Sequence, residues 1–182
     1  MIDFSSPTAL DGLLSFIEKN KIPAVICTTG YDEKQLKKIK CASEKTAILL
    51  SSNTSIGIQC MLRAVKLAAR ELTDFDAAIT EMHHTEKKDK PSGTAISLFK
   101  AITDEKSDLS PTDSKKQLSV HSIRCGNIVG EHSVLFAGEN EELIITHKAT
   151  DKAVFAHGAL KAAKFIIDKK TGFYEMSDLF GE

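Results

Sequence analysis

Two adjacent histidines, with a lysine a few residues beyond them, form the densest group of reactive side chains in the sequence. His83 and His84 are followed by Lys87, and the segment then reaches Pro91-Ser92-Gly93-Thr94. An unperturbed imidazole has a pKa of about 6.5, so such a pair can exchange protons close to neutrality. The proline and glycine predict a tight turn leading into a helix, whose free amides and neighbouring hydroxyls form a seat for an anion. The segment thus combines groups that exchange protons, a cation and a seat for an anion. This combination favours a small carboxylate substrate.

The sequence also allows other roles for the histidine pair. The flanking charges are typical of a solvated surface loop. A metal site is a third interpretation, because four potential ligands lie close together: Glu81, His83, His84 and Glu86. Adjacent side chains on a regular helix or strand point in different directions, whereas zinc helices place two histidines on one face. We therefore expect no metal. We expect the other histidines to be structural rather than catalytic: His121, His132, His147 and His157. For His147 a second role stays open, because it lies in a Thr-His-Lys strand end that could face the boundary between the two parts.

Short apolar runs alternate with helical patterns ahead of this segment. The predicted order is strand 2–4, helix 6–17, strand 23–28, helix 32–44 and strand 47–50. Strands that are apolar on both faces and separated by helices are typical of a parallel sheet with helices on both sides. A long amphipathic helix is predicted next, over 58–72.

A second group of strands is predicted beyond this helix, over 75–80, 118–124, 133–137 and 143–148. A turn over 138–141 joins the last two as a hairpin. Helices are predicted over 95–102 and from residue 153, and an exposed loop over 103–116. We predict an α/β protein with a partial Rossmann-like parallel sheet and an α+β substrate and oligomerisation domain with a mixed, largely antiparallel sheet. The predicted boundaries assign 1–54 and 153–182 to the first part and 55–152 to the second.

Composition narrows the class of protein. The 182 residues contain 24 Lys and Arg and 25 Asp and Glu, so there is no basic excess of the kind that nucleic-acid binding needs. No apolar run approaches the roughly 18 residues that cross a bilayer, and the first residues do not resemble a signal peptide. The four cysteines lie far apart along the chain, which favours reduced thiols, as in cytoplasmic proteins, over a disulfide framework. We therefore expect a cytoplasmic protein with a small-molecule substrate, and neither a nucleic acid nor a membrane as partner.

The segment from His83 to Ala95 resembles the signature of the dihydrodipicolinate reductase family. Further segments agree with the family in order and spacing, over 3–7, 28–31, 53–57, 124–132 and 145–149. The resemblance extends over essentially the whole chain. It implies an NAD(P)H-dependent reductase that converts 4-hydroxy-tetrahydrodipicolinate to tetrahydrodipicolinate in lysine and diaminopimelate biosynthesis. It also implies a dicarboxylate substrate and a homotetramer whose sheets in the second part pack together.

The resemblance also implies roles for individual residues. His83 and Lys87 match the proton-donating pair of the family. The expected dicarboxylate contacts are His84, Ser92, Gly93 and Thr94. The expected nicotinamide contacts are Cys27, Thr28, Thr29, Ser51, Ser52, Asn53 and Thr54. Lys152 stands where the family often has arginine.

One family feature has no counterpart in this sequence. None of the ten glycines forms a Gly-x-Gly pair, the core of the loop that holds a dinucleotide pyrophosphate at a helix N-terminus. We therefore expect NADH or NADPH to bind weakly. Two other functions follow as alternatives: a non-catalytic dicarboxylate-binding or assembly module derived from the reductase, and a metal-dependent hydrolase that uses the histidine pair.

Overall fold

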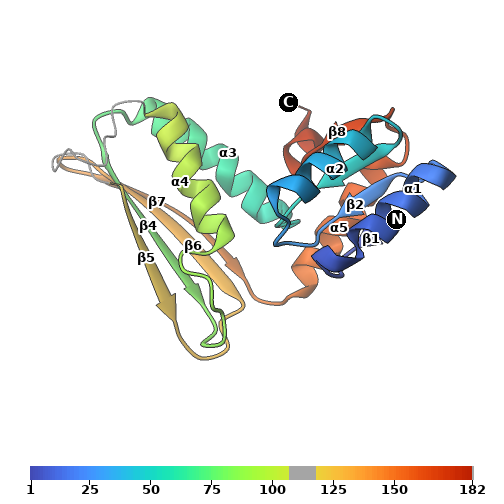
Figure 1. Ribbon diagram of the computed structural model, residues 1–182. Helices are drawn as coiled ribbons and strands as arrows, with labels where there is room; N and C mark the ends of the chain where they lie inside the picture. The colour runs from blue at the N-terminus through green and yellow to red at the C-terminus, as the bar shows by residue number, and fades with distance from the viewer. Residues whose placement is uncertain (107–117, 182) are drawn as a thin grey trace. The chain divides into compact units, whose positions relative to one another are not determined.

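The computed structural model describes residues 1–106 and 118–181, and the chain divides into two compact units (Figure 1). The first unit comprises Met1–Ile56 and Ala153–Glu182, and the second comprises Gly57–Lys152. The exposed loop predicted over 103–116 falls mainly on residues outside the described part, while its first residues belong to a helix. Within the described residues, no helix has the length and apolar character to cross a membrane.

The first unit is built on a parallel four-stranded sheet. The strands lie in the order β1 (Ile2–Asp3), β2 (Ala24–Ile26), β3 (Ala47–Leu50) and β8 (Gly172–Tyr174). Strands β2 and β3 pair in register from Ala24 opposite Ile48 to Ile26 opposite Leu50. Strand β8 has no counterpart among the predicted strands, because three residues are too few to show a period. The rest of the sheet confirms the predicted alternation of strands and helices.

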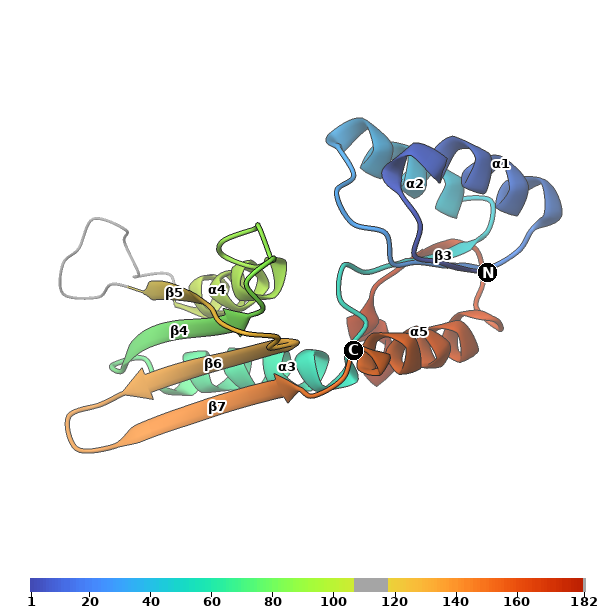
Figure 2. The ribbon, with the colours of Figure 1, turned by 90° about the horizontal axis from the view of Figure 1, so that it is seen from below.

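Helices cover both faces of this sheet (Figure 2). The helices α1 (Leu10–Asn20) and α2 (Glu33–Ser43) pack on one face, and α5 (Ala153–Ile166) packs on the other. Two short 3₁₀ helices accompany them, over Pro7–Ala9 and Met176–Phe180. Strand β2 separates the two cores, since Ala24 and Ile26 face α1 and α2 while Val25 faces α5.

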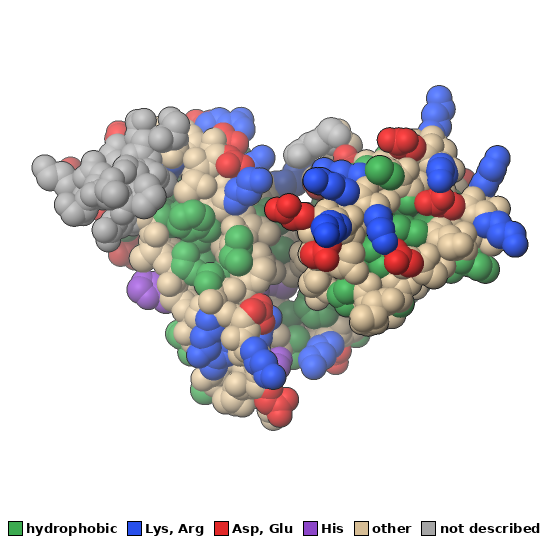
Figure 3. Space-filling model, in the orientation of Figure 1, with side chains coloured by type: hydrophobic (Ala, Val, Ile, Leu, Met, Phe, Trp, Pro, Cys, Tyr) green, Lys and Arg blue, Asp and Glu red, His purple; other side chains and the backbone are tan. Residues whose placement is uncertain are grey.

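Local sequence signals fix where the helices of this unit begin. Asp32 caps α2: its carboxylate accepts from the amide of Gln35 at 2.8 Å, and the Gln35 side chain accepts from the amide of Asp32 at 3.1 Å. On the outer surface, charges of both signs are mixed over α1 and α2 (Figure 3). Lys38 and Asp11 form one such exposed pair at 2.6 Å. Pairs of this kind contribute little to stability, so the apolar cores hold the helices in place.

The second unit contains a mixed sheet. Its strands lie in the order β5 (Ser119–Arg124), β4 (Asp76–His83), β6 (Gly130–Ala137) and β7 (Glu142–Ala149). Strand β4 is parallel to β5 and antiparallel to β6, and β6 and β7 form the predicted hairpin. The prediction of a mixed, largely antiparallel sheet is therefore confirmed.

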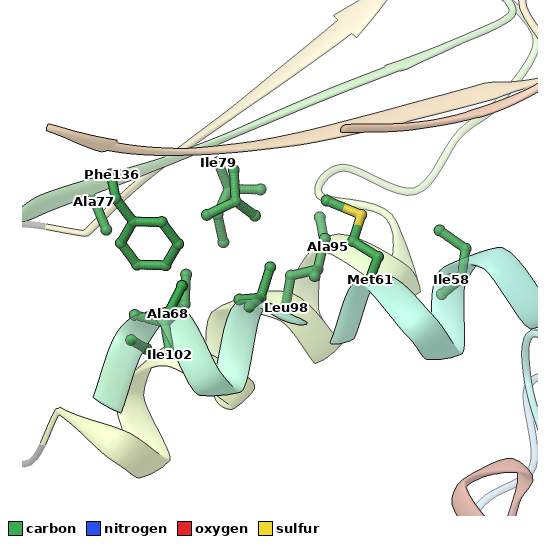
Figure 4. Packing of buried hydrophobic residues seen from close by; sticks show 12 residues of the cluster. Ile58, Met61, Ala68, Ala77, Ile79, Ala95, Leu98, Ile102 and Phe136 are labelled. Carbon is green, nitrogen blue, oxygen red and sulfur yellow. The ribbon is translucent and has the colours of Figure 1, made fainter. Parts of the chain in front are cut away.

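Two helices, α3 (Ile56–Glu71) and α4 (Gly93–Glu105), cover one face of the mixed sheet (Figure 1). Figure 4 shows the core between them, in which Phe136 and Ile79 of the sheet point toward Leu98 of α4. All three side chains are fully buried. Burial of side chains of this size contributes about 1.5–3 kcal/mol each, so this core fixes β4 against α4, the two elements that carry the histidine and Ser-Gly-Thr motifs.

Gly158 of α5 allows the helix to contact the loop that follows β3. A Cβ at this position would lie 1.7 Å from the carbonyl oxygen of Thr54, and the Thr54 hydroxyl donates to the carbonyl of Phe155 at 2.7 Å. We expect Gly158→Ala to lower the free energy of unfolding by about 1–3 kcal/mol, because backbone atoms would have to move apart. Urea denaturation measures the change.

Gly12 in α1 offers the matched control for this substitution. No atom lies within 4 Å of a Cβ at Gly12, so Gly12→Ala is expected to raise stability by about 0.5–1 kcal/mol through helix propensity. Equal effects of the two substitutions would show that the close contact at Gly158 does not matter.

Candidate functional site

Strand β4 places Glu81 and His83 on the same buried face of the mixed sheet. The sequence predicts a strand that ends at residue 80, but β4 continues to His83. Residues two apart on a strand point the same way, so the carboxylate of Glu81 contacts Nδ1 of His83 directly. Glu81 has no exposed surface and His83 is 7% exposed. His83 is therefore not part of a solvated surface loop.

Arg124 at the end of β5 completes this pair. Its two terminal nitrogens donate to the two carboxylate oxygens of Glu81, at 2.8 and 3.0 Å. The same guanidinium donates to two backbone carbonyls of the loop after β4: Nε to Lys87 at 3.2 Å, and a terminal nitrogen to Asp89 at 2.6 Å. One buried arginine thus holds both the carboxylate beneath His83 and the loop that carries Lys87.

Ser92 and His132 extend the cluster beyond Glu81. The Ser92 amide donates to Glu81 at 3.3 Å, and the Ser92 hydroxyl is 3.0 Å from Nε2 of His132. The same hydroxyl accepts from the Ala95 amide at 3.2 Å, so Ser92 is the N-cap of α4. His132 and His83 meet edge to face, with ring centroids 5.1 Å apart.

The electrostatics of this cluster give its groups different protonation states. Burial raises the pKa of Glu81, but hydrogen bonds from Arg124, Ser122 and His83 outweigh burial and lower it to about 2. Burial lowers the pKa of His83, Glu81 acts in the opposite direction, and the charges of Lys87 and Arg124 lower it further. Burial, followed by the nearby His83, lowers the pKa of His132 to about 4. At neutral pH Glu81 is ionised and His132 is neutral.

The other sequence-predicted substrate residues lie around this cluster. Lys87 is half-buried in the loop after β4, and its ammonium pairs with Asp89 at 2.8 Å. Gly93 and Thr94 form the first turn of α4, directly after its N-cap Ser92. The structure therefore brings His83, Ser92 and the Lys87 loop together through Glu81 and Arg124.

His84 lies apart from the buried cluster and lines a pocket of about 350 Å³. The other lining residues are Thr85, Glu86, Asn127, Val129 and Lys152. Lys152 and Glu86 bring groups of both charges to its lining, so this pocket suits a small polar molecule. Among the predicted dicarboxylate contacts, only His84 lines it.

Glu81, His83 and His132 are also the nearest approach to a metal site among the described residues. One potential ligand atom of each lies within 4.8 Å of the others. Both Glu81 oxygens already accept from the Arg124 guanidinium, so a cation would have to displace a buried charge. We interpret the cluster as a network that holds protons.

The predicted nicotinamide residues lie in the first unit, after the carboxyl ends of β2 and β3. This edge is where open parallel sheets bind ligands. Cys27, Thr28 and Thr54 are buried: the Thr28 hydroxyl donates to Asp3 at 2.6 Å, and burial, followed by the charge of Asp3, raises the pKa of Cys27 to about 12. Thr29 and Ser52 are exposed.

The loop after β3 holds its own shape. The Ser51 amide donates to Ile26 of β2 at 3.0 Å, and the Ser51 hydroxyl donates to the carbonyl of Asn53 at 2.8 Å. The Asn53 side chain in turn accepts from the Ser55 amide at 2.9 Å. Hydrogen bonds within the loop and to β2 therefore fix its backbone.

Comparison with known proteins decides the family. The N-terminal part of dihydrodipicolinate reductase matches residues 1–54, and its C-terminal part matches residues 57–180. The chain belongs to the dihydrodipicolinate reductase family. The 4-hydroxy-tetrahydrodipicolinate reductase of Brachyspira hyodysenteriae is 46% identical, over 98% of this chain and 81% of that protein. The protein of the same name from Thermosipho africanus is 44% identical, over 100% of this chain and 78% of its own length.

A solved structure shows that the dihydrodipicolinate reductase fold is shared. The dipicolinate-bound dihydrodipicolinate reductase from Paenisporosarcina sp. TG-14 superimposes with a TM-score of 0.79, over 96% of this chain and 70% of that one. Its sequence identity is 24%, so the likeness concerns the fold.

Sequence reasoning missed the roles of Glu81, Arg124 and His132 in this member of the dihydrodipicolinate reductase family. Glu81 was considered only as a metal ligand, and His132 as structural. The Glu-x-His spacing was a usable signal, since it places both side chains on one face of any strand. Arg124 gave no such signal, because its contact with Glu81 spans 43 residues.

Proposed function

We propose that this protein reduces 4-hydroxy-tetrahydrodipicolinate to tetrahydrodipicolinate with NADH or NADPH, in lysine and diaminopimelate biosynthesis. The observation that carries the proposal is the buried Glu81–His83 pair beside the Lys87 loop, in a chain up to 46% identical to relatives of that name. His83 and Lys87 are its proton-donating residues. The enzyme works in the cytoplasm, where its four cysteines, which are free, stay reduced.

The chemistry follows from what the two residues can supply. A coenzyme held at the loops after β2 and β3 would supply a hydride to an unsaturated ring, and a positioned acid would quench the negative charge that develops. The His83 imidazole can hold and release a proton, and the Lys87 ammonium provides a cation near the same point. The first turn of α4, with Gly93 and Thr94, holds a carboxylate of the substrate, and His84 contacts it from the polar pocket.

The two units bind different ligands in this proposal. Residues 1–54 and 153–182 hold the coenzyme, with its nicotinamide near the loops that follow β2 and β3. Residues 55–152 hold the substrate and the contacts between subunits. The exposed Ser52 and the fixed backbone of the loop after β3 fit a nicotinamide ring.

Calorimetry and a turnover assay test the function together. We expect pyridine-2,6-dicarboxylate to bind the chain, and we expect coenzyme oxidation when the ring substrate is present with excess NADH or NADPH. Dicarboxylate binding without turnover would favour the binding or assembly module instead. If neither binding nor turnover is found, the proposed function is wrong.

We further propose a homotetramer assembled through the mixed sheet. The face opposite α3 and α4 carries apolar side chains on three strands, among them Ile123, Leu135 and Ile144. Ile144 is 59% exposed and Ile123 is 42% exposed, and among the described residues no helix of this unit lies on that face. Apolar residues on both faces of a sheet favour packing against a second sheet.

Light scattering tests this assembly. We expect a mass near four times the 19.9 kDa of one chain, and we expect Ile144→Glu to lower it because the substitution buries a charge between sheets. Ile96→Glu is the control, since Ile96 is 55% exposed but lies on α4. A wild-type mass of one chain at micromolar concentration would contradict the tetramer.

A further inference from the structure

We propose that Glu81, held by Arg124, is a positioning residue that makes Nε2 of His83 the nitrogen that transfers the proton, and that the same Arg124 aligns the Lys87 loop. This inference rests on the proposed function for its kinetic part. Its structural part concerns the protonation of one ring and needs no turnover.

The first step is the choice of ring nitrogen. Glu81 is fully buried, and both of its oxygens accept from Arg124, so it remains an ionised carboxylate that can only accept hydrogen bonds. Nδ1 of His83 contacts this carboxylate and must therefore carry a hydrogen. In the neutral ring the other nitrogen, Nε2, has the free lone pair, and in the protonated ring Nε2 carries the proton available for transfer.

The second step is the placement of the ring. Gly130 of β6 lies against its Nε2 edge, where a Cβ would be 3.1 Å from Nε2 and 3.3 Å from Cδ2. The ring of His132 packs edge to face at 5.1 Å on another side. The ring is therefore confined by the carboxylate, by a glycine and by a second imidazole. Because Gly130 has no side chain, it bounds the ring without covering Nε2.

The third step joins His83 to Lys87. Arg124 donates to Glu81 and to the carbonyls of Lys87 and Asp89, so a single guanidinium fixes both the carboxylate and the loop. A planar fork with five donors can make these contacts at once, whereas a lysine ammonium cannot. Arg124 therefore sets the distance between the two proton-donating residues.

Charges around His83 determine the direction of the expected pH effect. The groups that face it are Glu81 on its own strand, Arg124 from β5, His132 from β6 and Lys87 from the following loop. Glu81 is the only one of these that favours the protonated ring. Its neutralisation must therefore lower the pKa of His83 and move the alkaline limb of the pH–rate profile to lower pH.

The test compares Glu81→Gln with Glu105→Gln. Glu105 is the matched control because Arg70 also holds it through two nitrogens, at 3.0 and 3.4 Å, away from the cluster. Nitrogen NMR of the ring reports the tautomer without substrate. In wild type and in Glu105→Gln we expect hydrogen on Nδ1. In Glu81→Gln we expect hydrogen on Nε2 in part of the molecules, a lower His83 pKa, and kcat reduced about 10- to 100-fold with KM changed much less.

Two results would overturn the proposal: a wild-type ring with hydrogen on Nε2 alone, or a Glu81→Gln protein with the wild-type tautomer and pH profile. If Glu81→Gln does not fold, Arg124→Lys tests the proposal instead. That variant keeps a charge for Glu81, so the tautomer should stay while kcat falls, and wild-type kcat would refute the alignment of the Lys87 loop. A wild-type protein with hydrogen on Nδ1 but no reductase activity would count against the proposed function and support the positioning of His83.

Discussion

His83→Ala and Lys87→Ala are each expected to lower kcat by about 10²–10⁴-fold, the usual contribution of a general acid. Under the proposed function both residues act on charge that develops only during reduction, so their loss should affect the transition state. Thr94→Ala is expected to raise KM with little change in kcat, because the proposed role of the first turn of α4 is to hold a carboxylate already present in the ground state. Steady-state reduction with excess coenzyme measures all three variants.

Two controls make this comparison specific. Lys88 is exposed in the same loop, and Lys88→Ala should leave both constants unchanged. Ser92→Ala is unsuitable as a binding variant, because Ser92 caps α4 and contacts His132, so it should cost about 1 kcal/mol of stability. Full kcat in His83→Ala and Lys87→Ala would remove both residues from the chemistry. Activity of His83→Ala that returns with added zinc would instead support the metal-dependent hydrolase.

Arg124→Met is expected to lower the free energy of unfolding by about 3–5 kcal/mol, because it leaves the carboxylate of Glu81 buried without its partner. The Arg124 side chain is 6% exposed and Glu81 is not exposed at all, so water cannot replace the guanidinium. Arg70→Met removes the partner of Glu105, where the arginine is 61% exposed, and should destabilise the protein far less. Urea denaturation of both variants gives the comparison.

The stability of Arg124→Met is expected to change with pH in the opposite direction to that of wild type. In wild type the pKa of Glu81 is about 2, below its ordinary 4.5, so its contribution to stability is present above pH 4.5 and is lost as the pH falls toward 2. Without Arg124, burial dominates and raises the pKa of Glu81 above its ordinary value. Stability of Arg124→Met should therefore fall, relative to wild type, as the pH rises above the ordinary carboxyl pKa of 4.5. A parallel pH trend in the two proteins would show that Arg124 does not set the charge of Glu81.

Much of the fold could be predicted because its signals are local. Apolar runs of a few residues predicted β2 and β3, and the three- and four-residue spacing of apolar side chains predicted α1 and α3. The order of these elements required a parallel sheet, since a helix between two strands returns the chain to the same edge. The end of β4 was misplaced because polar residues normally end a strand, whereas here a buried ion pair allows Glu81 and His83 to continue it.

The sequence by itself determined the family motif, most of the strands and helices, and the presence of two histidines beside a lysine and a Ser-Gly-Thr turn. Tertiary structure decided which of these groups meet. Strand β5 pairs with β4 and brings Arg124 to Glu81, and β6 brings His132 to Ser92 across 40 residues. These contacts depend on which strands become neighbours in the sheet. Strand order is fixed by burial of the whole core, and residue spacing along the chain does not encode it.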